Sequence, residues 1–185
     1  MKKIIFLTSS PINGGNGDTL IESAMESAKA QGADVRRIDI RNRKIGFCKA
    51  CYKCATDGVC VQRDDMAEIL AAIHESDGIV AEAPVYYNCL SAQAMTVIDR
   101  LCCTFACKTY QIGAKKKVGI LLTCVGSKPD ELKQQVAGIL TLPSLSRAIT
   151  EFQSQVFTGC TTSDTCKNTS DYLKCARRIG TWAAQ

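Results

Sequence analysis

Short apolar runs alternate along the chain with longer segments in which apolar residues recur every three or four positions. The runs predict buried β-strands, and the recurring positions predict amphipathic helices. The expected strands cover residues 3–8, 34–40, 78–83, 117–123 and 149–158. The expected helices cover residues 19–31, 65–76, 91–107, 129–140 and 168–183, with Asp65 as the N-cap of a capping box and Pro129 at the first helical position.

Alternation of strands and helices is typical of a parallel sheet with helices on both faces. Five strands favour the doubly wound, flavodoxin-like order 2-1-3-4-5 over the six-stranded dinucleotide-binding fold. A length of 185 residues suits one such α/β domain, so we expect a single unit over residues 1–185. Residues 41–63, after the second strand, show neither helical nor strand periodicity of apolar residues. Irregular segments of that length are usually functional or disordered.

Charge and composition narrow the class of protein. Lys and Arg number 23 against 18 Asp and Glu, but the basic residues are dispersed and aromatic residues make up only 6%, which argues against a nucleic-acid partner. The first apolar run has four residues, too short for a signal peptide or a spanning helix, so we expect a cytoplasmic protein with no membrane partner. Twelve cysteines in a reducing compartment point to thiolate ligands or free thiols rather than disulfides.

Ligands of doubly wound sheets bind beyond the carboxyl ends of the strands where the strand order reverses, here at the loops after the first and third strands. The first loop, residues 9–19, is rich in Ser, Gly and Asn and leads into a helix, so its backbone amides suit a phosphate. It lacks the dinucleotide fingerprint and the P-loop lysine. An ordinary capped turn is the alternative, and the carboxylate of Asp18 would compete for the same amides.

The loop after the third strand, residues 83–88, joins Pro84 to two tyrosines, Tyr86 and Tyr87. Aromatic side chains and backbone amides at a strand end suit a flat heteroaromatic ring. The alternative is a pair of tyrosines packed on the surface.

Four closely spaced cysteines form the most specific motif of the chain, C-x2-C-x2-C-x5-C, made by Cys48, Cys51, Cys54 and Cys60. Three cysteines spaced three apart let a tight loop fold around a corner of a [4Fe–4S] cubane. Zinc sites more often pair two separated C-x2-C units. We therefore favour a cluster, with zinc or metal-free thiols as alternatives.

The other candidate groups have ordinary interpretations. His74 is the only histidine and lies on an expected solvated helix face, which excludes hydrolysis by Ser-His-Asp or Cys-His groups. The eight cysteines outside the motif, three of them in the expected helix 91–107, are interpreted as small buried apolar residues.

An ordered set of short motifs resembles the NAD(P)H-dependent FMN reductase family, and within it the iron–sulfur flavoprotein branch. The set consists of Ser10-Pro11, Gly17-Asp18-Thr19, Pro84-Val85-Tyr86-Tyr87, Ser91-Ala92-Gln93 and Asp99-Arg100. The resemblance implies an FMN site made by Ser10, Ile12, Asn16, Gly17, Asp18, Thr19, Pro84, Val85, Tyr86, Tyr87, Asn88, Thr123, Cys124 and Gly126. It also implies a [4Fe–4S] cluster on the four motif cysteines and a homodimer or homotetramer.

The chain departs from the family pattern near the expected phosphate. Ile12 stands where an Arg is usual and Asp18 where an Asn is usual, so FMN should bind more weakly unless Asp18 caps the helix or pairs with a Lys. The cofactors would carry the chemistry, and no side chain is expected to be catalytic in its own right. Three functions stay open: an enzyme passing electrons from ferredoxin or NAD(P)H through FMN and the cluster to a small acceptor, a non-enzymatic electron carrier, and an NAD(P)H-dependent FMN or quinone reductase without a cluster.

Overall fold

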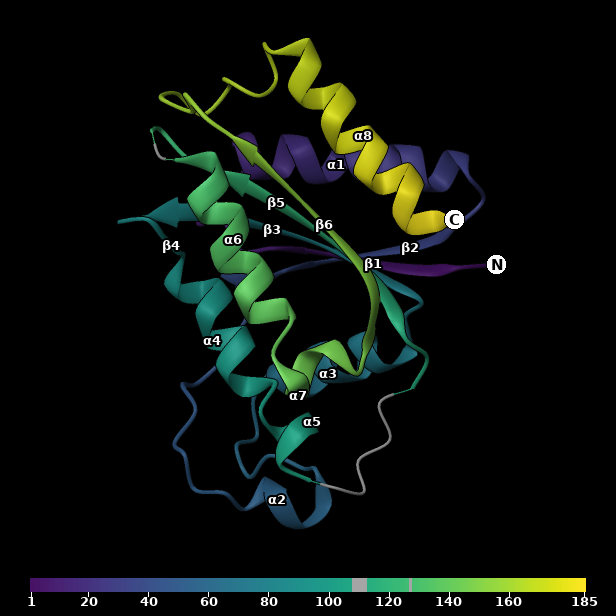
Figure 1. The fold of residues 1–185 in the computed structure, drawn as a ribbon, viewed down its shortest axis with the longest axis vertical. Helices are drawn as coiled ribbons and strands as arrows, with labels where there is room; N and C mark the ends of the chain where they lie inside the picture. The colour runs from purple at the N-terminus through teal and green to yellow at the C-terminus, as the bar shows by residue number, and fades with distance from the viewer. Residues whose placement is uncertain (108–112, 127) are drawn as a thin grey trace.

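The computed structural model describes residues 1–107, 113–126 and 128–185. Across these ranges a parallel sheet runs in the order β2-β1-β3-β5-β6 (Figure 1). Its strands are β1 (Lys3–Thr8), β2 (Asp34–Asp39), β3 (Gly78–Tyr86), β5 (Lys116–Thr123) and β6 (Ile149–Phe157), and a two-residue strand β4 (Cys89–Leu90) pairs antiparallel with the end of β3. The predicted flavodoxin-like order is confirmed, because the five parallel strands follow the 2-1-3-4-5 pattern.

Helices cover both faces of the sheet (Figure 1). One face carries α1 (Asn16–Ala30) and α8 (Ser170–Ala184), and the other carries α3 (Met66–Glu75), α4 (Ala92–Arg100) and α6 (Pro129–Leu140). Short helical turns are η1 (Ile40–Asn42), α2 (Cys54–Asp57), α5 (Cys103–Ala106) and α7 (Pro143–Ser146). None of the helices in the described ranges is both long and apolar enough to cross a membrane.

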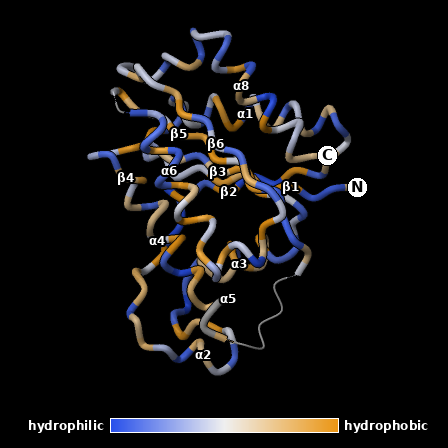
Figure 2. The backbone as a smooth tube through the Cα atoms, in the orientation of Figure 1, coloured by the Kyte–Doolittle hydropathy of each residue, from blue (hydrophilic) through white to orange (hydrophobic). Residues whose placement is uncertain are grey.

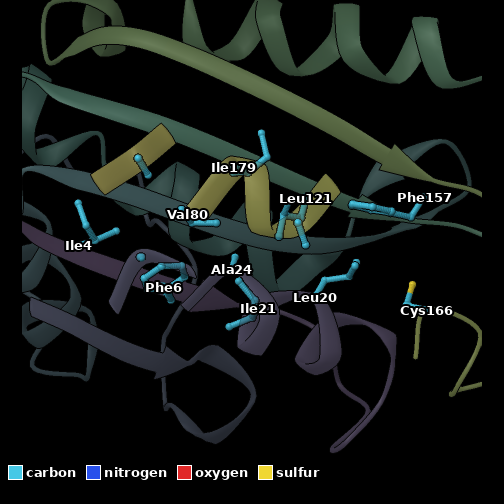
Figure 3. Packing of buried hydrophobic residues seen from close by; sticks show 13 residues of the cluster. Ile4, Phe6, Leu20, Ile21, Ala24, Val80, Leu121, Phe157, Cys166 and Ile179 are labelled. Carbon is cyan, nitrogen blue, oxygen red and sulfur yellow. The ribbon is translucent and has the colours of Figure 1, made fainter. Parts of the chain in front are cut away.

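The core is built by alternate faces of the strands. Phe6, Val80 and Leu121 face α1 and α8, where they contact Leu20 and Ile179 (Figure 3). The opposite side chains, such as those of Leu7 and Leu122, pack under α3, α4 and α6. Figure 2 shows apolar residues along the central strands, as expected for a parallel sheet buried on both faces.

Three details of the predicted helices are wrong. Helix α1 begins at Asn16 rather than residue 19, so the end of the first loop is already helical. Asp65 is the N-cap residue of α3, as predicted, but the capping box does not form. Asp64 accepts the hydrogen bond from the amide of Met66 at 3.2 Å, and Glu68 pairs with arginines. The expected helix 91–107 ends at Arg100, and residues 103–106 form the separate α5.

The break between α4 and α5 has a local cause. The amide of Thr104 bonds to the carbonyl of Leu101, a spacing of three residues, and the Thr104 hydroxyl donates to the same oxygen at 2.8 Å. A hydroxyl that bonds to a nearby carbonyl competes with the α-helical ladder. The chain therefore turns at Leu101 and Cys102, which brings Cys102 and Cys103 toward the cysteine motif.

Candidate functional site

The loop after β1 is anchored on β3. The amide and the hydroxyl of Ser9 both donate to the carbonyl of Glu82, at 3.1 and 2.8 Å. Ser10 is buried, and its hydroxyl accepts a hydrogen bond from the amide of Ile12 at 3.3 Å. Gly14 adopts a left-handed conformation with φ 67°, which reverses the chain before α1 begins. The first loop is thus a fixed turn at the N-terminus of a helix.

Asp18 is neutralised by two arginines. Its buried carboxylate lies 2.6 Å from Arg37 Nη2 and 2.9 Å from Arg41 Nη2, and it accepts the amide of Gly14 at 2.6 Å. The alternative expectation, that Asp18 pairs with a basic side chain, is confirmed, but the partners are Arg37 and Arg41 and not a lysine. A phosphate at this loop would not meet an uncompensated negative charge.

Arg41 brings a guanidinium to the first loop from the segment after β2. Besides pairing with Asp18, its guanidinium donates to the carbonyls of Ser10 and Ile12 at 3.1 and 3.3 Å. The cation therefore reaches the first loop from the segment after β2, a contact that no short motif encodes.

The side chain of Asn16 bonds to the segment after β6. Its side-chain nitrogen donates to the carbonyl of Thr162 at 2.6 Å, and its oxygen accepts the amide of Cys166 at 2.8 Å. Asn16 therefore ties the start of α1 to the segment after β6. Gly17 and Thr19 follow it in the first turns of the same helix.

Glu82 is a functional candidate that the sequence interpretation missed. Its carboxylate is buried and accepts hydrogen bonds from the hydroxyls of Thr8 and Thr123, at 2.9 and 3.2 Å. A Cβ atom placed on Gly17 would lie 2.5 Å from this carboxyl group, so only glycine lets α1 begin directly above it. Burial raises the pKa of Glu82 to about 7. The available signal was a charged residue inside an otherwise apolar strand.

The loops after β3 and β5 meet the first loop at one edge of the sheet. Pro84 pairs in register with Thr123, because β3 and β5 are neighbours. Tyr87 and Asn88 have φ values of 52° and 58° and form the two-residue turn between β3 and β4, as in a type I′ hairpin. Thr123 and Cys124 are buried. The expected loop 83–88 is only partly a loop, because β3 runs on to Tyr86 and Val85 pairs with Leu90 of β4. The side chains of Tyr86, Tyr87 and Val125 are exposed, and Gly126 follows Val125 in the loop after β5.

The four motif cysteines line a single cavity of about 200 Å³, together with two thiols from the α4–α5 turn. The lining includes Cys48, Cys51, Cys54, Cys60, Cys102, Cys103 and Arg100. The sulfur atoms of Cys48 and Cys102 are 3.6 Å apart. The interpretation of Cys102 and Cys103 as ordinary buried residues is therefore incomplete, since the turn after α4 places both in the wall of this cysteine cavity.

The backbone of the cysteine motif is strained. Ala50 and Tyr52, on either side of Cys51, have φ values of 48° and 54°, which L-residues with a side chain rarely adopt. Such strain persists only where the surroundings hold it, and it is common at ligand-binding sites. The two left-handed residues bend the loop so that successive cysteines line the same cavity.

An ion pair fixes the cysteine loop to the domain. The guanidinium of Arg100 lies 2.7 Å from Asp64 and donates to the carbonyl of Gly46 at 2.7 Å. The hydrogen bond from Arg100 holds the pKa of the Asp64 carboxyl below its usual value, and the same bond raises the pKa of Arg100. This pair connects the end of α4 to both ends of the loop.

The thiols of the cysteine cavity lie around a volume and do not converge on one point. No group of three or more His, Cys, Asp or Glu side chains within the described ranges is arranged to hold one metal ion. The thiols instead surround a volume, and a cubane needs thiolates at separate corners rather than four at one point. Thiolates are ligands both of iron–sulfur clusters and of zinc.

Residues 2–156 match the family of NADPH-dependent FMN reductases, and the chain belongs to this family. It is 36% identical over 99 residues to an iron–sulfur flavoprotein of Archaeoglobus fulgidus, covering 54% of this chain and 45% of the relative. It is 35% identical over 126 residues to an iron–sulfur flavoprotein of Methanosarcina thermophila, covering 68% and 64%. The chain thus spans less than two thirds of the length of these curated relatives.

Solved structures with low sequence identity share the fold. An NAD(P)H:quinone oxidoreductase from Methanothermobacter marburgensis superimposes with a TM-score of 0.72 at 16% identity, over 97% of this chain and 98% of that one. A flavodoxin from the domain Archaea gives 0.60 at 13% identity, over 98% and 96%. These likenesses support the doubly wound fold.

Proposed function

We propose that the protein is an FMN-dependent oxidoreductase of the iron–sulfur flavoprotein type, passing electrons from ferredoxin or NAD(P)H through FMN and a [4Fe–4S] cluster to a small acceptor. The observation that carries the proposal is the pairing of two sites on one fold. The carboxyl edge of β1, β3 and β5 carries the first loop, which suits a phosphate, and residues 84–88 and 123–126, which suit a flat ring. All four motif cysteines line one cavity. Family membership and the named relatives support the same assignment.

The first loop is the proposed phosphate site. Backbone amides at the start of α1, with the hydroxyls of Ser10 and Thr19, bind one terminal phosphate, helped by the positive end of the helix dipole. Arg41 holds the loop through the carbonyls of Ser10 and Ile12. The loop has no pyrophosphate fingerprint, so we assign FMN rather than FAD.

The end of β3, the turn from β3 to β4 and the loop after β5 form the proposed ring site. Bound FMN would accept a hydride or single electrons at its flavin ring. Residues 84–88 supply backbone amides and aromatic side chains to orient the ring, while residues 123–126 cover its other side. Tyr86, Tyr87 and Val125 are exposed in the single chain, so we propose that a second copy of the chain covers this edge in a homo-oligomer.

The experiment that tests the proposal is anaerobic reconstitution followed by assay of iron, sulfide and flavin. The wild-type chain should hold iron and sulfide in equal amounts and bind FMN. Replacing Cys48, Cys51, Cys54 and Cys60 together with Ala should abolish bound iron and leave FMN binding intact. The matched control replaces Cys89 and Cys175, which lie outside the cavity lining, and should keep its iron. Zinc without sulfide in the wild type, or equal iron in the fourfold variant, would contradict the cluster.

The family match favours a second candidate, an NAD(P)H-dependent FMN or quinone reductase in which the cysteines carry no cluster. Stopped-flow reduction of bound FMN by NADPH separates the two. Equally fast flavin bleaching in the wild type and the fourfold cysteine variant, with no iron in either, would favour this candidate. Loss of electron transfer to the acceptor with loss of iron favours the iron–sulfur enzyme.

A further inference from the structure

Arg100 is a buried cation with one unused donor. Its side chain is 1% exposed, and its two terminal nitrogens bond to Asp64 and to the carbonyl of Gly46. Its Nε atom is buried and has no hydrogen-bond partner among the described residues. A guanidinium stays protonated in proteins, so Nε keeps its proton and remains a buried donor that needs an acceptor. A buried donor without an acceptor is rare and needs an explanation.

The surroundings of Arg100 indicate which acceptor is missing. Arg100 lines the cysteine cavity beside Cys60, Cys102 and Cys103. Cys60 and Arg100 also line a second cavity together, next to α3, so the two side chains are neighbours on both sides of the loop. Metal binding converts a cysteine thiol to a thiolate, which is a far better hydrogen-bond acceptor.

We propose that Nε–H of Arg100 donates a hydrogen bond to the metal-bound sulfur of Cys60 and thereby raises the reduction potential of the metal centre. The inference rests on the proposed metal centre and adds a positioning and tuning residue to it. Hydrogen bonds to ligand sulfur and nearby charge are recognised controls on cluster potentials. One-electron reduction adds one negative charge to the centre, and a donor aimed at the sulfur stabilises that charge.

The partner of Arg100 makes the sign of the effect testable. Asp64 places a negative charge on the far side of the guanidinium. Removing the Nε donor should make the centre harder to reduce, whereas removing the Asp64 charge should make it easier to reduce. Both changes disturb the same ion pair, so simple loosening of the loop would move the two potentials in the same direction.

The test is a redox titration of anaerobically reconstituted protein, with dithionite as the one-electron donor and EPR of the reduced centre as the readout. Arg100→Lys keeps the positive charge but loses the planar Nε–H, and Arg100→Gln loses both. We expect Arg100→Lys to retain iron and to lower the equilibrium constant for reduction about tenfold, a fall of about 59 mV. Asp64→Asn should shift the potential upward, and circular dichroism should confirm that each variant is folded.

The outcomes separate the role of Arg100 from the proposed function. If the wild type holds iron and Arg100→Lys has the wild-type potential, the assignment of Arg100 is wrong and the metal centre stands. Potentials that fall together in Arg100→Lys and Asp64→Asn also overturn it, because both variants then act by loosening the loop. A wild-type chain that takes up no iron or sulfide refutes the proposed metal centre, and the role of Arg100 with it.

Discussion

Replacing Glu82 with glutamine should remove the loss of folding stability that the ionisation of this buried carboxyl group causes at high pH. The carboxyl group is 1% exposed, and it accepts hydrogen bonds from neutral donors, the hydroxyls of Thr8 and Thr123 and the backbone of Ser10. Burial raises its pKa from 4.5 to about 7. At about 1.4 kcal/mol for each pKa unit, a shift of this size corresponds to about 3 kcal/mol.

The sign follows from which state binds the proton more tightly. In the unfolded chain Glu82 ionises near pH 4.5, whereas in the folded protein it stays protonated until about pH 7. The folded state therefore loses stability relative to the unfolded state as the pH rises between these values, and the loss is complete above pH 7. The glutamine side chain of the variant cannot ionise. Thr8 and Thr123 bond to different oxygens of Glu82, so the glutamine oxygen accepts one hydroxyl while its NH2 group donates to the oxygen of the other.

Urea unfolding of the wild type and Glu82→Gln at pH 5 and pH 8 measures this effect. The stability of the variant relative to the wild type should improve by about 2–3 kcal/mol between pH 5 and pH 8. Glu151→Gln, at an exposed position of β6, is the matched control and should show no such change. If the free energies of unfolding of the wild type and Glu82→Gln change by the same amount from pH 5 to pH 8, the ionisation of Glu82 does not destabilise the folded protein as proposed.

Three further predictions concern the carboxyl edge of the sheet, where we propose that FMN binds. Asp18→Asn should lower the free energy of unfolding by about 3 kcal/mol, because Arg37 and Arg41 lose their shared buried carboxylate, and an unchanged urea midpoint would refute this. Arg41→Ala should weaken FMN binding about tenfold in a fluorescence titration, because the hydrogen bonds that hold the first loop are lost. Equal affinity would show that the loop keeps its conformation without Arg41. Tyr87→Gly should raise the free energy of unfolding by about 1 kcal/mol, because glycine adopts a φ of 52° without strain, and a destabilised variant would mean that the exposed ring packs on something.

The strand pattern was predictable because parallel strands buried on both faces are continuous apolar runs. The span Lys3–Thr8 matches the prediction, as does the helix Pro129–Leu140, which begins with its proline. Local rules also located the cysteine motif and the two loops at the carboxyl edge of the sheet. These features depend on residues that are close together in the sequence.

The parts that sequence reasoning missed depend on long-range contacts. Arg41 reaches the first loop across 29 residues, and Arg100 reaches Asp64 across 36. The thiols of Cys102 and Cys103 join the cysteine cavity only because α4 stops at Arg100. Such pairings have no local signature in a single sequence.

The capping prediction failed for a different reason. Asp65 occupies the N-cap position, but the side chain that bonds to the start of α3 is that of Asp64, which Arg100 also holds. The carboxylate of Asp65 instead accepts the amide of Lys44 at 2.7 Å. Tertiary contacts therefore determine which of the two neighbouring carboxylates bonds to the start of α3.

Titration of flavin-free protein with FMN, riboflavin and FAD decides whether the carboxyl edge of the sheet is an FMN site. We expect saturable quenching of FMN fluorescence, with riboflavin weaker because it lacks the phosphate and FAD weaker because the first loop suits one terminal phosphate. Arg41→Ala should reduce the preference for FMN over riboflavin, since Arg41 organises that loop. No binding of FMN, or tighter binding of FAD, would contradict the assignment of this edge as an FMN site.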